Sequence, residues 1–147
     1  MRIPNYKVGW IIPHKVAGLT HFHSDIQQED VAGVFLETQK LLQNVDVPFH
    51  ILIDNRLAPL NKIYSLEELQ QFSPFLRHPF LNYIIIVKPD GLKLESGQIG
   101  VEEKNGISLK NVGTVPEAFD FLNEVIPDLD KGQIDLGFLA EKRIDSK

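Results

Sequence analysis

The chain has no cysteine among its 147 residues. Without thiols it can form neither a disulfide framework nor a thiolate metal site, and it offers no cysteine nucleophile. The same absence favours an intracellular protein, and we expect a cytoplasmic location. An excess of basic residues is also lacking, because the formal charge is −5. This charge argues against general nucleic-acid binding, for which a basic surface supplies most of the affinity.

Long apolar segments are absent as well. The longest strongly apolar run covers residues 83–87, far fewer than the roughly 20 residues that a membrane-spanning helix requires. The first residues carry no apolar core of a signal peptide. We therefore expect a soluble protein without membrane insertion.

Motifs of catalysis are missing too. No serine lies in a Gly-x-Ser-x-Gly elbow. Gly97 and Gly100 have neither a strand before them nor the Lys-Ser/Thr pair of a phosphate-binding loop after them. The adjacent acidic pairs at 67–68 and 102–103 are typical of solvated surfaces. The sequence thus predicts that the protein is not an enzyme and holds no cofactor.

What the chain does contain is the composition of a globular domain, with 43% hydrophobic and 24% charged residues. Its length suits one domain over residues 1–147 with a core of its own. The run 49–54 follows Pro48, precedes a polar loop with Pro59, and contains several branched apolar residues. This pattern predicts a central strand buried on both faces.

Further strands are expected over residues 8–12, 16–22, 81–88 and 107–112. The last of them is narrow, and we expect it at an edge of the sheet. Apolar residues at helical spacing predict helices over 28–43, from 66 with a bend at Pro74, and from 115 to 126. Ser65 with Glu68 forms the sequence of a capping box, and Thr114 caps the last helix. The expected inward-facing residues are Val31, Val34, Phe35, Thr38, Leu41, Leu42, Val45, Leu69, Phe72, Leu76, Val115, Ala118, Phe119, Leu122, Val125 and Ile126.

Two segments allow more than one interpretation. Residues 92–106 fit either a short helix that ends at Asn105-Gly106, or a hairpin that pairs 99–103 with 107–111 around that Asn-Gly. Residues 128–147 mix charges with large apolar side chains. We expect this C-terminal tail to dock on its own subunit or on a neighbouring one.

The order of elements predicts an α/β fold with a mixed, partly parallel sheet. The strand end at 51–54, the buried run 84–87 and the stretch 112–122 carry a resemblance to the SpoIIAA-like fold group, which is related to the STAS domains of anti-sigma-factor antagonists. The chain looks like a small uncharacterised member of that group over residues 8–127. The resemblance implies a sheet of four to five strands with helices mainly on one face, and a non-catalytic role.

In the anti-sigma antagonists, an aspartate at the strand end is followed directly by a phosphorylated serine. Here Asp54 is followed by Asn55 and Arg56, and the next hydroxyls are those of Tyr64 and Ser65. The loop nevertheless lies where open α/β sheets place ligands, beyond the carboxyl end of a strand. We therefore predict a binding site of Asp54, Asn55, Arg56 and Tyr64. The alternative is a local ion pair or loop hydrogen bonds.

His21 and His23, with Asp25 nearby, form the one pattern suggestive of a metal site. Alternate residues of a strand share a face, so both imidazoles can reach one ion, with His50 as a third ligand. Histidines at strand ends are also common without a metal. We expect no metal, and His21 and His23 are the candidates if one binds.

Three functions follow from these features. The first is a non-catalytic protein-interaction or regulatory module that self-associates as a homodimer and has a protein partner. The second is a carrier of a small apolar, lipid-like ligand, because the aromatic residues exceed what one small core needs and Phe75 and Phe80 suit a cavity or an interface. The third is a metal-assisted enzyme at His21 and His23.

Overall fold

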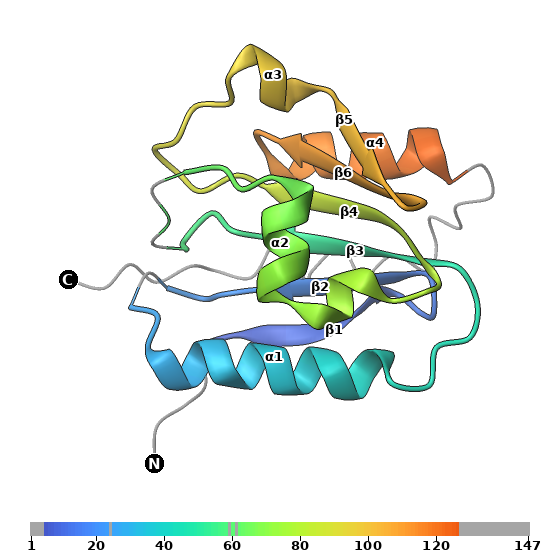
Figure 1. Cartoon of the computed structure of the whole chain (residues 1–147). Helices are drawn as coiled ribbons and strands as arrows, with labels where there is room; N and C mark the ends of the chain where they lie inside the picture. The colour runs from blue at the N-terminus through green and yellow to red at the C-terminus, as the bar shows by residue number, and fades with distance from the viewer. Residues whose placement is uncertain (1–4, 24, 59, 61, 127–147) are drawn as a thin grey trace.

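The computed structural model describes residues 5–23, 25–58, 60 and 62–126. These residues form a mixed α/β fold around one six-stranded sheet with the order β1-β2-β3-β4-β6-β5 (Figure 1). The strands are β1 (Lys7–Ile12), β2 (Val16–Thr20), β3 (Phe49–Asp54), β4 (Leu81–Val87), β5 (Val101–Lys104) and β6 (Ile107–Val112). The α/β class is confirmed, whereas the expected four to five strands are one or two too few.

The inner strands of the sheet are parallel. β2, β3, β4 and β6 run in one direction, and β1 and β5 lie antiparallel to them at the two edges. β3 is central, with Leu52 opposite both Gly18 of β2 and Ile85 of β4. Leu52 is fully buried, as the apolar run predicted, because helices cover both faces of the sheet at this strand.

The sixth strand comes from the segment that the sequence left open. Asn105 and Gly106 have φ angles of 54° and 83°, which suit a two-residue hairpin turn between β5 and β6. The hairpin is therefore confirmed. A short helix, α3 (Ser96–Ile99), precedes it and does not reach Asn105. β5 pairs with the outer side of β6, so the expectation that residues 107–112 form the edge strand is wrong. The sequence did not reveal β5 as the edge strand because its four residues are all exposed and show no alternation of apolar and polar side chains.

Helices cover the sheet on both sides. α1 (Gln28–Leu42), α2 (Leu66–Phe72) and the 3₁₀ turn η1 (Pro74–Arg77) pack on one face, where Leu42, Leu66 and Leu76 join the core. α4 (Val115–Val125) packs on the other face through Ala118 and Leu122, and it lies behind β5 and β6 in Figure 1. The expectation of helices mainly on one face holds for α1, α2 and η1, and α4 departs from it.

The predicted helix starts are confirmed. The Ser65 hydroxyl accepts a hydrogen bond from the Glu68 backbone N–H, while the Glu68 carboxylate accepts one from the Ser65 N–H. The Thr114 hydroxyl accepts the N–H of Glu117. Pro74 ends α2 and opens η1, as its fixed φ and missing donor require. The described helices include none long and apolar enough to cross a membrane.

The predicted inner faces are wrong at three residues. Val31 and Phe35 of α1 are 44% and 41% exposed, and Phe72 of α2 is 55% exposed. The buried residues of α1 include Asp30, which the sequence did not suggest. These three apolar side chains miss the core because α1 and α2 stand apart above the sheet and leave a space between them. The predicted docking of residues 128–147 lies outside the described residues.

Candidate functional site

The parallel strands β2, β3 and β4 end at Thr20, Asp54 and Val87 on one edge of the sheet, the carboxyl edge. Open α/β sheets commonly bind ligands beyond this edge. Here α1 and α2 stand on either side of a cavity of about 350 Å³, the α1–α2 cavity. Its apolar lining comes from the strands, from both helices, from η1 and from the loops before α1 and after β3: Leu19, Ile53, Ile86, Ile26, Val31, Val34, Phe35, Ala58, Leu60, Leu69, Phe72, Phe75 and Leu76.

The walls of the cavity explain the exposed side chains of α1 and α2. Val31 and Phe72 both line it, so these exposed side chains belong to one hollow and are not isolated apolar residues on the surface. Fully burying a side chain of this kind is worth about 1.5–3 kcal/mol. A cavity that keeps such side chains half-covered therefore forgoes stability that an occupant of the same character would restore.

A buried polar cluster lies beside the cavity at the end of β3. Asp54 is buried, with 3% of the residue exposed. Its carboxylate accepts a hydrogen bond from the Thr20 hydroxyl at 2.7 Å. It also accepts three from Arg56: from the backbone N–H at 3.1 Å, from Nε at 2.9 Å and from Nη2 at 2.8 Å. Burial by itself would raise the pKa of Asp54, but the hydrogen bonds from Arg56 and Thr20 outweigh it and the pKa is lowered. The carboxylate is thus ionised and fully engaged at neutral pH.

This cluster changes how the predicted binding residues are interpreted. Asp54 and Arg56 form a local ion pair, which is the alternative that the sequence left open. Asp54, Asn55 and Tyr64 all line the cavity, and a contact between any of them and a ligand stays a prediction. An Asp54→Ala variant would leave the buried Thr20 hydroxyl and the Arg56 guanidinium without this carboxylate, so we expect it to destabilise the fold.

Tyr64 follows Asp54 in the sequence by about ten residues and lies on a wall of the cavity. Its ring packs edge-on against Phe72, with 5.3 Å between centroids. The Lys62 ammonium lies 4.9 Å from the centre of the same ring. Tyr64 also lines a second, polar recess of about 410 Å³ beside α2, where Ser65, Glu68, Gln98 and Glu102 contribute polar groups. The Glu102 carboxylate accepts the Leu66 N–H there at 3.2 Å.

The histidine pattern does not converge on one point. The His21 Nδ1 lies 2.8 Å from the Asn5 carbonyl oxygen. His50 is in register with Val16, five residues before His21 on the neighbouring parallel strand, so the two histidines are about 16 Å apart along the sheet. His50 is therefore wrong as a third ligand. Within the residues that the structure describes, no group of three or more potential metal ligands occurs.

Asn5 is a residue that the sequence analysis missed. It is 1% exposed; its side-chain oxygen accepts the N–H groups of Phe22 and His23, and its own N–H donates to the Asp30 carboxylate at 3.1 Å. Asp30 also accepts the Gln27 N–H at 2.8 Å. These bonds fix the loop between β2 and α1, which forms one side of the cavity. An asparagine before the first strand carries no pattern that predicts such a role.

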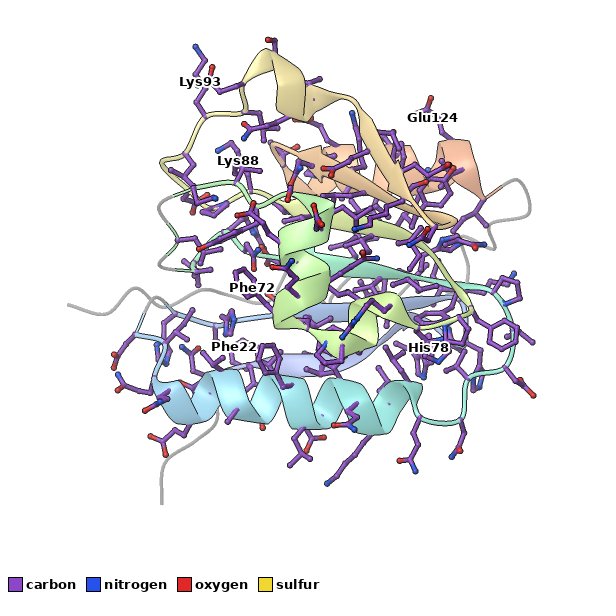
Figure 2. All side chains as sticks on the ribbon, viewed as in Figure 1. Phe22, Phe72, His78, Lys88, Lys93 and Glu124 are labelled. Carbon is purple, nitrogen blue, oxygen red and sulfur yellow. The ribbon has the colours of Figure 1, made fainter. Side chains whose placement is uncertain are left out.

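A third hollow, the α1–η1 groove, lies along the carboxyl half of α1. It is an open groove of about 900 Å³. The described lining residues are Phe35, Leu36, Gln39, Lys40, Leu42, Gln43, Pro74, Phe75, Arg77, His78 and Pro79, and none of them is acidic. His78, labelled in Figure 2 at the end of η1, links the two walls of the groove, because its Nε2 lies 3.2 Å from the Leu42 carbonyl oxygen of α1.

Comparisons with protein-family models, with curated proteins and with solved structures find no match for the chain. The site is therefore interpreted from its own geometry.

Proposed function

We propose that the protein is a non-catalytic carrier that holds a small, largely apolar ligand in the α1–α2 cavity. The observation that supports it is the apolar cavity of about 350 Å³ at the carboxyl edge of the parallel strands. Ligand cavities typically enclose about 300–1,000 Å³ and are lined mostly by apolar and aromatic side chains with a few polar groups. Asn55, Tyr64 and His21 supply such polar groups in this lining.

The polar groups around the cavity support binding rather than catalysis. Asp54, the one carboxylate among the described lining residues, is held by Thr20 and Arg56. The His21 imidazole is in contact with a backbone carbonyl oxygen. A general acid or base needs a side chain that is free to exchange a proton with a substrate. The hydrogen bonds of Asp54 occupy that carboxylate, whereas the contact of His21 occupies Nδ1 alone and orients the ring.

A test of the carrier function compares two valines of similar exposure. Val31 lines the cavity and is 44% exposed, while Val47 does not line it and is 47% exposed. Native mass spectrometry of gently purified protein should show an added apolar mass on the wild type and on Val47→Trp, and none on Val31→Trp, whose indole fills the space. Organic extraction identifies the class of the bound compound. Equal loading of the two variants contradicts the proposal.

A second candidate function is a protein-interaction or regulatory module that forms a homodimer in the cytoplasm, as the resemblance to the SpoIIAA-like group implies. The exposed edge strand β5, where Val101 is 52% exposed, favours it, because an unpaired strand edge offers backbone hydrogen-bonding groups to a second chain. The native mass spectrum decides between the functions: a dimer that lacks added mass supports the module, and a monomer that carries a ligand supports the carrier.

A further inference from the structure

We propose that the ligand is a long-chain acid, whose apolar chain fills the α1–α2 cavity and whose anionic end lies in the α1–η1 groove between Lys40 and Arg77. This inference rests on the proposed carrier function and adds the chemical class of the ligand. It starts from the positions of the two hollows, which lie side by side along α1.

The cavity and the groove meet at a pair of aromatic rings. Phe35 of α1 and Phe75 of η1 line both hollows. Their rings pack edge to face, with 6.0 Å between centroids and 63° between planes. Phe35 is 41% exposed, and side chains on the surface change rotamer within nanoseconds. In the proposed complex, a rotation of this ring joins the two hollows and lets one extended chain pass between them.

Charge distinguishes the ends of that channel. Lys40 and Arg77 line the groove, and both are exposed. Within the described residues neither of them forms a hydrogen bond or ion pair, and no acidic residue lines the groove. On the other side of the cavity, the polar recess presents the carboxylates of Glu68, which is paired with the Lys62 ammonium, and Glu102. An anionic group is therefore attracted to the groove in preference to the recess.

The sign of the groove is opposite to that of the chain, whose formal charge is −5. Arginine suits a carboxylate or phosphate end because its planar guanidinium donates two parallel hydrogen bonds to one anion. Lysine adds a second, mobile positive charge. The pair of Phe35 and Phe75 lines both the groove with these cations and the apolar cavity. A single molecule with an apolar chain and an acidic end can therefore fill the cavity with its chain and pair its acid with the cations.

The test uses a neutral fluorescent probe, N-phenyl-1-naphthylamine, which has no charge to favour the groove. Dodecanoic acid and dodecan-1-ol then compete for the full-length protein at pH 8 and low salt. We expect the acid to displace the probe at a concentration at least roughly fivefold lower than the alcohol, as two exposed charge pairs allow. The double variant Lys40→Gln/Arg77→Gln should remove this preference and leave the alcohol unchanged.

A matched control removes the same charge elsewhere. Lys88 and Lys93 are labelled in Figure 2 far from His78 and the groove, and neither lines the cavity or the groove. Lys88→Gln/Lys93→Gln should keep the preference for the acid, whereas a loss in this control indicates only long-range attraction and overturns the site. Dodecyl phosphate in place of the acid tells whether the groove prefers a phosphate or a carboxylate end.

The two proposals fail in different ways. If the acid and the alcohol compete equally with the wild type, the acidic ligand is wrong and the carrier function stands. If the neutral probe does not bind, or binds Val31→Trp as tightly as the wild type, the carrier function fails and takes the ligand class with it.

Discussion

The carboxyl and amino ends of the parallel strands form two sides of the sheet that are built differently. At the carboxyl edge, the buried residues Asp54 and Asn5 form hydrogen bonds that fix the loops around the apolar α1–α2 cavity. At the opposite edge, where the parallel strands begin (the amino edge), His50 is the second residue of β3, and its buried Nδ1 has no hydrogen-bond partner among the described residues. The α1–η1 groove lies along the carboxyl half of α1, and its Lys40 and Arg77 form no ion pair with any residue that the structure describes. The two edges thus differ in chemistry: buried hydrogen bonds hold the loops that shape the cavity at one edge, whereas the groove at the other presents the positive charges of Lys40 and Arg77.

Substitution of Asp54 should break the carboxyl edge with the largest effect. Asp54→Ala leaves the Thr20 hydroxyl and the partly buried Arg56 guanidinium without their acceptor. We expect the free energy of unfolding to fall by about 2–4 kcal/mol, since removal of one member of a buried ion pair takes away the acceptor of several hydrogen bonds at once. Urea denaturation measures it, and Arg77→Ala at the amino edge is the control; similar losses in both variants contradict the comparison.

Acid should affect the two edges in separate pH ranges. Burial lowers the pKa of His50 from 6.5 to about 4, so between these values the unfolded chain binds more protons than the folded one, and stability falls as the pH falls. The pKa of Asp54 is lowered from 3.8. Its contribution is complete above the unfolded pKa and disappears as the pH falls through the folded one.

The measurement is the free energy of unfolding between pH 7 and pH 3. We expect His50→Gln to flatten the curve in the upper part of this range only. Asp54→Asn should flatten it below pH 4 only. A single variant that flattens the whole curve means that the two edges are coupled, contrary to the comparison.

Loosening the loop of the cavity should have a smaller effect on stability. Asn5→Ala removes the acceptor of the Phe22 and His23 N–H groups, and we expect a loss of about 1–3 kcal/mol for buried donors left without a partner. Hydrogen exchange should rise in residues 21–27. Exchange that stays unchanged there, while the unfolding free energy falls, shows that Asn5 does not hold the loop.

The smallest effect on stability belongs to the groove. Arg77→Gln should change the free energy of unfolding by no more than about 0.5 kcal/mol, as for other exposed side chains that lack partners. Thermal unfolding of this variant provides the measurement. A large loss means that the groove is part of the packed structure and is not open for a ligand.

Local rules predicted much of the fold. The capping box at Ser65, the apolar run of β3 and the turn at Asn105-Gly106 each depend on neighbouring residues, and the sequence displays all of them. The edge strand β5 was left open because its four exposed residues show no apolar alternation. Its place depends on pairing with β6, which local pattern describes only through the turn.

The site was less accessible to sequence reasoning. Helical spacing placed Val31 and Phe35 on an inner face, but spacing cannot tell a core from a cavity wall, because both require apolar side chains. The sequence places Asp54 at the end of a strand, and the structure confirms this position. The sequence gives no sign of its buried partner Thr20, which lies 34 residues earlier in the chain. Asn5 and Asp30 were missed because their hydrogen bonds join segments that only the fold brings together.

The most direct test of the account is the dissociation constant of the neutral probe for two variants, Val31→Trp and Val47→Trp. If the α1–α2 cavity binds apolar ligands, Val31→Trp should weaken probe binding by about tenfold or more, the loss expected when roughly 1.4 kcal/mol of buried contact is removed. Val47→Trp should bind as the wild type does. Equal affinities in the two variants would contradict the cavity as the binding site.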